Sequence, residues 1–225
     1  MASFFAREYI TFFQNLERNN HKEWFHANRD SYETNVRQPF LEFVSATARE
    51  IQKDGWNIEI NPSHCISRIN RYIRFSKDKS PYNLYMTVFF SNHASKDKSL
   101  PGIFLRFGAR NASFMVVCYG PDTKQLKAIR RSISNTTEIF QKILKNQTLA
   151  RNFGTLQGER SKRLPREFKE TESRCTDIGR KQFYFVREEK PAFLLKPDLL
   201  KRTMELWKAS KPFNEFLMEA YHGVQ

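Results

Sequence analysis

Hydrophobic residues in segment 1–54 recur at helical spacing. Between Phe5 and Leu16, apolar side chains fall at intervals of three or four, and a second stripe with the same period follows. Pro39 lies inside the second stripe, where its missing amide hydrogen predicts a kink. Gly55 ends the pattern. We therefore expect residues 1–54 to be mainly helical.

The period changes from Trp56 onward, where apolar and polar residues alternate as they do in a half-buried strand. The candidate strands are rich in β-branched and aromatic residues and lie close together in sequence, which favours an antiparallel meander over 55–120. The candidates are residues 56–60, 66–75, 84–90, 103–107, 114–119 and 183–186. Together they predict an antiparallel sheet of about five to six strands.

Helical spacing returns after the meander. Asp122 can cap a helix at the start of a region, 121–153, whose apolar residues again recur every three or four positions. Residues 154–181 are polar and basic. A long segment without periodicity is typical of a functional or mobile loop. We expect a basic loop here.

The last region, 182–225, is predicted to hold one strand and two C-terminal helices. Pro197 and Pro212 each precede an apolar stripe, and proline is common in the first turn of a helix. Along the chain, helices therefore come both before and after the strands. This order predicts an α+β fold that forms a single domain over residues 1–225.

The formal net charge of +14 is concentrated in two segments. Residues 68–79 hold five Lys and Arg against one Asp, and residues 121–170 hold twelve against five acidic residues. Such concentration favours an anionic partner: phosphate, nucleic acid, an acidic protein or anionic lipid. A solvated basic face that keeps the protein soluble is the alternative for 121–170.

The N-terminal segment offers no secretion signal, because Arg7 and Glu8 interrupt its apolar run. No apolar stretch has the length of a membrane span. The three cysteines are too few and too scattered for a disulfide framework or a zinc cluster. We expect a cytoplasmic protein with reduced thiols.

Common catalytic signatures are missing from the sequence. It contains no Walker loop, no GxGxxG and no GxSxG, and no pair of histidines lies at metal-ligand spacing. No metal site is predicted, and the pattern indicates neither a cofactor nor an oligomeric state. The residues leave open whether the protein is an enzyme.

The segment 68–82 has the densest grouping of residues that could form a binding or catalytic site. With strand geometry, Arg68 and Arg74 share one face, whereas Arg71 lies on the apolar face. Because burial of an unpaired guanidinium is costly, Arg71 should meet a carboxylate or line a pocket. Helical geometry clusters the same cations.

A turn follows this segment at residues 76–81. Ser76, Lys77, Asp78 and Lys79 bring a hydroxyl, two ammonium groups and backbone amides into a small space that suits phosphate or carboxylate oxygens. Asp78 lies between two lysines and should stay ionised, as a positioning or metal-contacting carboxylate or as a cap of the turn. A ligand or catalytic site and a structural ion-pair cluster both fit.

Taken together, these residues resemble an uncharacterised family catalogued as domain of unknown function 2461, over nearly the whole chain. The resemblance rests on the two strings 68–71 and 74–82 and on the following scattered positions: Phe12, Leu16, Asn19, Asn20, Lys22, Trp24, Phe25, Asn28, Arg29, Tyr32, Glu33, Pro39, Tyr119, Gly120, Pro121, Leu126, Arg130, Leu164, Pro165 and Arg166. It implies an α+β domain and no established activity. Tyr72 and Glu167 depart from the family pattern, which usually has Asp and Gly there.

The resemblance adds a second wall to the candidate site. Asn20, Trp24 and Arg29 lie near one another at the start of a helix. Trp24 suits either the core or a ligand platform. Arg166, in the basic loop, can close over an anion.

Three functions remain open. The first is a pocket for a phosphate- or carboxylate-bearing small ligand, with the enzyme question unresolved. The second is a nucleic-acid-binding module that uses the motif and residues 124–169, aided by Tyr72 and Tyr82. The third is a scaffold that contacts an acidic protein through Arg166. The predicted ligand-binding residues are Arg68, Arg71, Arg74, Ser76, Lys77, Asp78, Lys79, Tyr82, Asn20, Trp24, Arg29 and Arg166.

Overall fold

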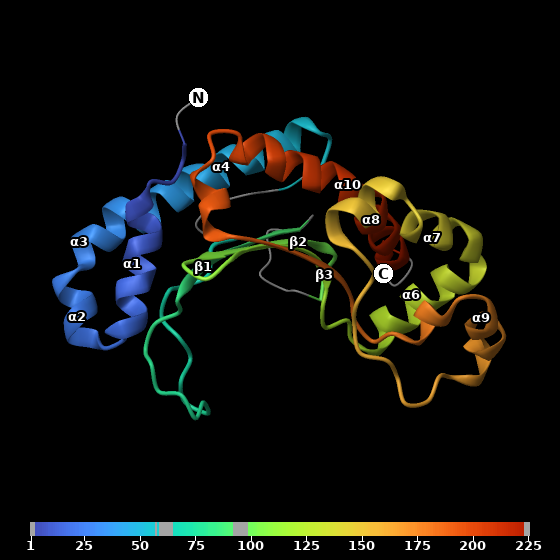
Figure 1. Ribbon diagram of the computed structural model, residues 1–225. Helices are drawn as coiled ribbons and strands as arrows, with labels where there is room; N and C mark the ends of the chain where they lie inside the picture. Colours follow the sequence, from blue (N-terminus) through green and yellow to red (C-terminus); the bar gives the residue numbers. More distant parts are fainter. Residues whose placement is uncertain (1–2, 57, 59–64, 92–98, 223–225) are drawn as a thin grey trace. The chain divides into compact units, whose positions relative to one another are not determined.

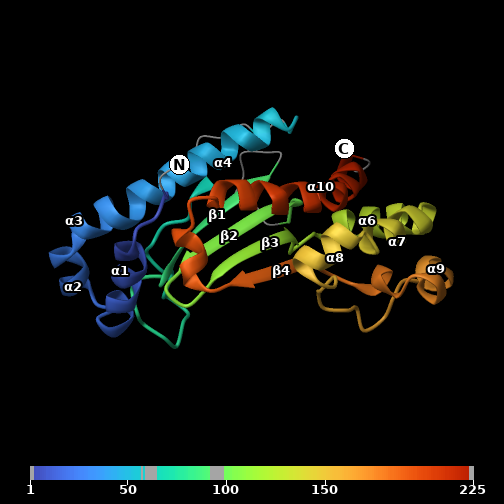
Figure 2. The same ribbon diagram turned by 45° about the horizontal axis from the view of Figure 1, so that its top comes forward.

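A computed structural model describes residues 3–56, 58, 65–91 and 99–222. It confirms the α+β class. The sheet is antiparallel and its strands pair in chain order: β1 (Tyr85–Ser91), β2 (Gly102–Gly108), β3 (Ala112–Cys118) and β4 (Phe183–Glu189). Figure 2 shows the four strands side by side in this order. The prediction of five to six strands is therefore wrong for the described residues, which form four.

The predicted strand 66–75 is the clearest error. Its residues make only isolated bridges in the structure, from Ile66 to Val88 and from Asn70 to Tyr82. Pairing stops beyond the second bridge because Pro81, in the opposite arm, has no amide hydrogen to donate to a ladder. The other missing candidate, 56–60, lies mostly outside the described residues.

The structure consists of two compact units. The first comprises Met1–Lys96, Phe104–Phe114 and Glu188–Glu205. The second comprises Asp97–Ile103, Met115–Arg187 and Leu206–Gln225. The expectation of a single domain stays a prediction.

Helices dominate the N-terminal part of the first unit, as the hydrophobic spacing predicts (Figure 1). In chain order they are α1 (Arg7–Arg18), α2 (Lys22–Ala27), α3 (Arg29–Tyr32), a π-helical turn (Glu33–Arg37) and α4 (Gln38–Lys53); a 3₁₀ turn, Pro191–Leu195, also belongs to this unit. The irregularity expected at Pro39 occurs as the π-helical turn just before it. Because proline cannot donate to the carbonyl four residues earlier, the local bonding pattern widens there.

Aromatic rings fill the core of the first unit around Phe107 of β2. The rings of Phe5, Phe40 and Phe43 lie 5.4 to 6.0 Å from that of Phe107. The Tyr9 hydroxyl, on α1, donates to the Phe107 carbonyl at 3.1 Å. Burial raises the pKa of Tyr9 well above its ordinary value, so this hydroxyl stays a donor. These contacts anchor α1 and α4, and with them the helices that follow α1.

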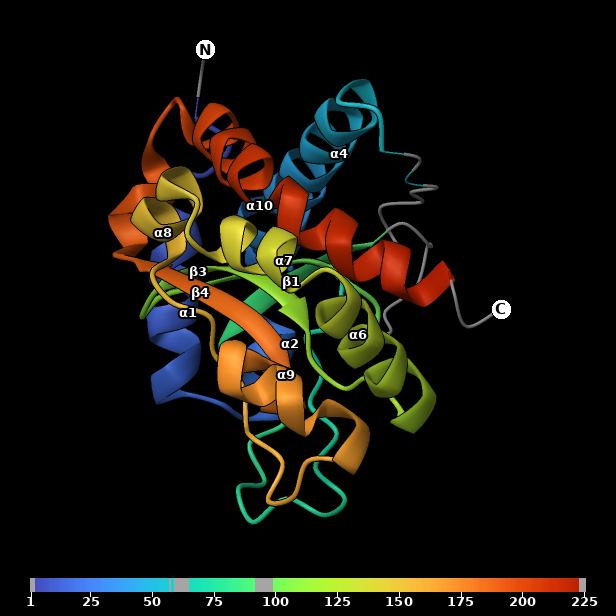
Figure 3. The same ribbon diagram turned by 90° about the vertical axis from the view of Figure 1, so that its right-hand side faces the viewer.

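The second unit contains the helices predicted in 121–153 as three separate elements (Figure 3). They are α6 (Thr123–Asn135), α7 (Thr137–Leu144) and α8 (Gln147–Phe153). Asp122 caps α6 as predicted: its side chain accepts from the Gln125 amide at 2.8 Å, and the Gln125 side chain accepts from the Asp122 amide at 2.7 Å. The breaks at Thr136 and Asn146 are the N-cap positions of α7 and α8, and the Asn146 side chain accepts from the amides of Thr148 and Leu149.

The basic loop predicted at 154–181 contains several short helices. It contains a 3₁₀ turn at Arg166–Phe168, α9 (Lys169–Arg174) and a second 3₁₀ turn at Thr176–Gly179. Bridges from Gln157 to Tyr184 and from Arg160 to Arg180 fasten the remaining segment. Backbone bonds to distant residues stabilise this segment, and such bonds leave no periodic signal in the sequence.

The C-terminal region holds one continuous helix, α10 (Leu199–His222), where two were predicted. Pro212 lies inside it. Ser210 and Trp207 keep a side-chain bond in this turn, from the serine hydroxyl to the tryptophan carbonyl at 2.8 Å. All helices of the described chain are too short or too polar to cross a membrane.

Candidate functional site

The segment 66–84 forms a two-armed loop in the first unit that precedes β1 (Figure 1). The two arms are joined by backbone bonds: the Arg71 amide donates to the Pro81 carbonyl at 2.8 Å, and the Asn83 amide donates to the Ile69 carbonyl at 2.7 Å. The loop is therefore closed at its base, and residues 72–80 form its outer part.

Asp78 organises the outer part of this loop. Its carboxylate accepts from the Ser80 hydroxyl at 2.6 Å, from the Ser80 amide at 2.9 Å and from Arg71 Nη1 at 2.5 Å. These bonds, with the Ser80 hydroxyl first among them, lower the pKa of Asp78 to about 2. Arg71 also donates to the Ser80 carbonyl at 3.2 Å. Arg71 thus has the carboxylate partner expected from its position, and it acts as a brace of the loop.

Asn20 and Phe25 hold the base of the loop against the N-terminal helices. The Asn20 side chain donates to the Tyr82 carbonyl at 3.0 Å and accepts from the Tyr82 amide at 3.1 Å. The Phe25 ring, on α2, stacks on the Tyr82 ring with centroids 4.1 Å apart. Because a side-chain amide satisfies both backbone groups of Tyr82, this residue is fixed in position relative to α2.

An open cavity of about 470 Å³ lies in the first unit between these helices and the loop. The helices contribute residues of a single face that recur at helical spacing, and the loop contributes four more. The lining residues are Lys22, Phe25, His26, Arg29, Tyr32, Glu33, Arg37, Arg68, Ile69, Asn70 and Tyr82. We call this the loop–helix cavity.

Positive charge dominates the loop–helix cavity. Arg37 pairs with Glu33 at 3.2 Å, whereas Lys22, Arg29 and Arg68 have no ion-pair partner among the described residues. The floor is aromatic and its hydroxyls are protonated at neutral pH. Burial raises the pKa of Tyr32 to about 12.

The pKa of Tyr82 is also raised, mainly by burial and then by Glu23, while Arg29 opposes the shift. The Tyr82 hydroxyl therefore interacts electrostatically with Arg29. Three cations and protonated phenols surround a space that suits the oxygens of a phosphate or carboxylate.

The structure distributes the predicted site residues over different places. Arg68, Arg29 and Tyr82 line the loop–helix cavity, and Asn20 lies behind it as a clamp. The three motif arginines do not converge on one cavity. Arg71 lies at the base of the loop, and the outer part carries the others: Arg74, Ser76, Lys77, Asp78 and Lys79.

Two further predicted residues lie elsewhere. Trp24 is half-buried with its ring 5.6 Å from that of Phe12, a packing contact. Arg166 belongs to the second unit, so its part in this site stays a prediction. The binding of nucleic acid by residues 124–169 and the contact with an acidic protein partner also stay predictions.

Sequence reasoning did not select Lys22, His26 and Asn70 as site residues. A signal for two of them was present, because Lys22, His26 and Arg29 stand at i, i+4 and i+7, which places them on one helical face. Asn70 lies two residues after Arg68 in the motif and forms the bridge to Tyr82, which also lines the cavity.

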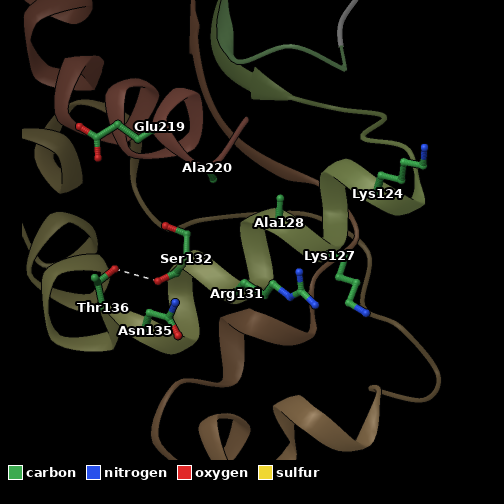
Figure 4. Close-up of a pocket in the computed structure, with 9 residues that line it drawn as sticks. All are labelled: Lys124, Lys127, Ala128, Arg131, Ser132, Asn135, Thr136, Glu219 and Ala220. Carbon is green, nitrogen blue, oxygen red and sulfur yellow. Dashed lines mark hydrogen bonds between the residues drawn. The ribbon is translucent and has the colours of Figure 1, made fainter. Parts of the chain in front are cut away.

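A second basic cavity, of about 510 Å³, lies within the second unit. Figure 4 shows Lys124, Lys127 and Arg131 along α6, with Glu219 on α10. Lys127 pairs with Glu167 at 3.3 Å. Glu167 is one of the two positions at which the chain departs from the pattern of the family that it resembles. Each cavity has one carboxylate in its wall, but the second has three Lys and Arg side chains where the loop–helix cavity has four, so the second cavity is less cationic.

The fold and the cavities define an α+β protein whose motif loop lines a cationic cavity. The chain belongs to the family of conserved hypothetical proteins DUF2461, whose model matches residues 8–216. No curated protein matches the sequence. The resemblance of the motif is thus confirmed at the level of the family, to which no activity is assigned.

Proposed function

We propose that the loop–helix cavity binds a small ligand that carries a phosphate or carboxylate group. The observation that supports this is the approach of Lys22, Arg29 and Arg68 to one cavity without a carboxylate partner among the described residues. Like charges brought together raise the energy of the unliganded protein, and an anion between them relieves this repulsion. The proposal assigns binding and no reaction.

The surrounding contacts favour a preorganised site. Asn20 and Phe25 fix the Tyr82 backbone and ring, and Arg68 lies in the same arm as the bridge residue Asn70. A ligand that meets a fixed wall loses less affinity to ordering than one that must first order a loop. Arginine side chains present a planar fork that pairs with two oxygens of phosphate or carboxylate.

Thermal unfolding in the presence of inorganic phosphate or citrate tests the proposal, with ionic strength held constant by KCl. A bound anion at about 100 times its Kd stabilises the wild-type protein by about 2.7 kcal/mol. Arg68→Ala and Arg29→Ala should each weaken the apparent affinity by roughly tenfold or more, because a charge-assisted bond is lost. Titration calorimetry measures the affinity directly.

Arg131→Ala, in the wall of the second cavity, is the matched control, and Arg74→Ala is a second one outside both cavities. Both variants lose the same charge, so they should keep the affinity of the wild type. Equal losses in all four variants would show that the anions respond to net charge alone. An absence of stabilisation by either anion in the wild type also contradicts the proposal.

A further inference from the structure

The outer part of the motif loop exposes two aromatic rings. Tyr72 is 75% exposed and Phe75 is 82% exposed, the highest values among the large hydrophobic side chains of the described chain. Their ring centroids lie 6.3 Å apart. Since burying a ring of this size is favourable, such a pair on a surface marks an interaction site.

The exposure of these rings is imposed by the loop. The Ser76 amide donates to the Ile73 carbonyl at 3.2 Å and closes a turn with Arg74 and Phe75 at its corner. Lys79 Nζ donates to the same carbonyl at 3.1 Å, and the bonds of Asp78 hold the opposite arm. A braced turn prevents the rings from folding back onto the first unit, so they are held ready for a partner.

Cations flank the two rings in the sequence. Residues 71–79 carry four Lys and Arg against one carboxylate, that of Asp78, which Arg71 already engages. Arg74 and Lys77 have no ion-pair partner among the described residues, and the Arg74 guanidinium lies 5.3 Å from the centre of the Phe75 ring. The partner must therefore combine negative charge with an apolar layer.

We propose that the turn formed by residues 72–77 docks onto an anionic membrane surface, with Tyr72 and Phe75 entering the headgroup region. Aromatic rings settle at the membrane–water boundary, and Lys or Arg beside them pair with lipid phosphates. Figure 1 and Figure 3 both show the loop extending away from the helices and strands of the first unit, as this requires. The turn lines neither cavity, so this proposal is independent of ligand binding.

The geometry of the rings favours a bilayer over single-stranded nucleic acid. Bases stack on ring faces that lie open along a groove. Here the two ring planes are 60° apart, and Arg74 lies over one face of Phe75. A fluid interface accepts rings in any orientation.

Sedimentation with unilamellar vesicles tests the inference on the full chain. The wild type should bind vesicles of phosphatidylcholine with phosphatidylserine, bind pure phosphatidylcholine vesicles far less, and lose binding as salt is raised. The double variant Tyr72→Ser, Phe75→Ser should lower the partition coefficient by about tenfold or more. Phe75→Trp should give a blue-shifted emission on binding the anionic vesicles, in a difference spectrum against the wild type.

The matched control is Tyr119→Ser, which removes another exposed ring, 51% exposed, from the second unit. It should bind the vesicles as the wild type does. Three results overturn the inference: no preference for the anionic vesicles, unchanged binding by the double variant, or ring-dependent binding of a single-stranded oligonucleotide in place of vesicles.

Discussion

Several cations of the second unit and those of the loop–helix cavity are used in opposite ways. In the second unit, Arg130 is buried and donates to the carbonyls of Ile178, at 3.1 Å, and Arg180, at 3.3 Å. Arg160 likewise donates to the Thr176 carbonyl at 2.6 Å. In the loop–helix cavity of the first unit, cations face open space instead.

This difference shows that the net charge of a segment does not reveal what the charge does. The segment 121–170 has the larger excess of cations, yet several of them stabilise turns or pair with carboxylates such as Glu167. The motif has a smaller excess, and Arg68 remains available to a ligand. Cations whose hydrogen bonds are satisfied within the fold act as structure, and unpaired cations around a cavity are candidates for binding.

The largest effect that can test this comparison is expected at Arg130. Its three bonds, to two carbonyls and to the Ser161 hydroxyl at 2.6 Å, are made in a buried place, and burial lowers the pKa of this guanidinium. Arg130→Leu should lower the free energy of unfolding by about 2–4 kcal/mol, because buried carbonyls lose their donors. Urea denaturation measures the loss.

Arg68→Ala is the control for this prediction, because the Arg68 side chain is exposed and unpaired among the described residues. Its free energy of unfolding should stay within about 0.5 kcal/mol of the wild-type value. If the two variants lost equal stability, the distinction between structural and available arginines would fail.

The next effect concerns Asn20, which fixes the motif loop to the N-terminal helices. Asn20→Ala removes both bonds to the Tyr82 backbone and should lower the free energy of unfolding by about 1–2 kcal/mol. It should also weaken anion binding, because Arg68 and Tyr82 lose their fixed position. Denaturation and calorimetry on the same protein measure the two effects.

Asn19→Ala is the matched control, since the bond that the Asn19 side chain makes among the described residues stays within its own helix end, to the Asn15 carbonyl at 3.0 Å. A small loss of stability with wild-type anion affinity is expected for it. Wild-type affinity in Asn20→Ala would show that the loop needs no such clamp.

Much of the fold was predictable because it depends on local periodicity. The N-terminal helices, the α6 cap at Asp122 and strands β1, β2, β3 and β4 follow from spacing and from single capping residues. The arms of the motif loop alternate like a strand, but Pro81 prevents a ladder. Whether one arm can pair as a strand depends on the residue that faces it in the other arm, and the sequence of a single arm does not contain that information.

The candidate site was predictable only in part for the same reason. The motif identified Arg68 and Tyr82, whereas the partner wall depends on which helix face packs against the loop. Arg71 and Arg68 are three residues apart and have different roles, because Asp78 reaches the first and no described carboxylate reaches the second. Contacts between distant residues decided these roles.

The smallest effect is expected within the motif itself, at the Arg71–Asp78 pair. Hydrogen bonds lower the pKa of Asp78 from 3.8 to about 2, so the folded pKa is below the unfolded one. The stabilisation is therefore complete above about pH 4, and it is lost as the pH falls toward 2.

Carboxyl NMR should show a midpoint near 2 for Asp78. Ser80→Ala should raise it more than Arg71→Gln, because the Ser80 hydroxyl makes the largest contribution, and Lys77→Ala should leave it unchanged. A wild-type midpoint near 4 would mean that Asp78 does not brace the loop, and that Arg71 is as available to an anion as Arg68.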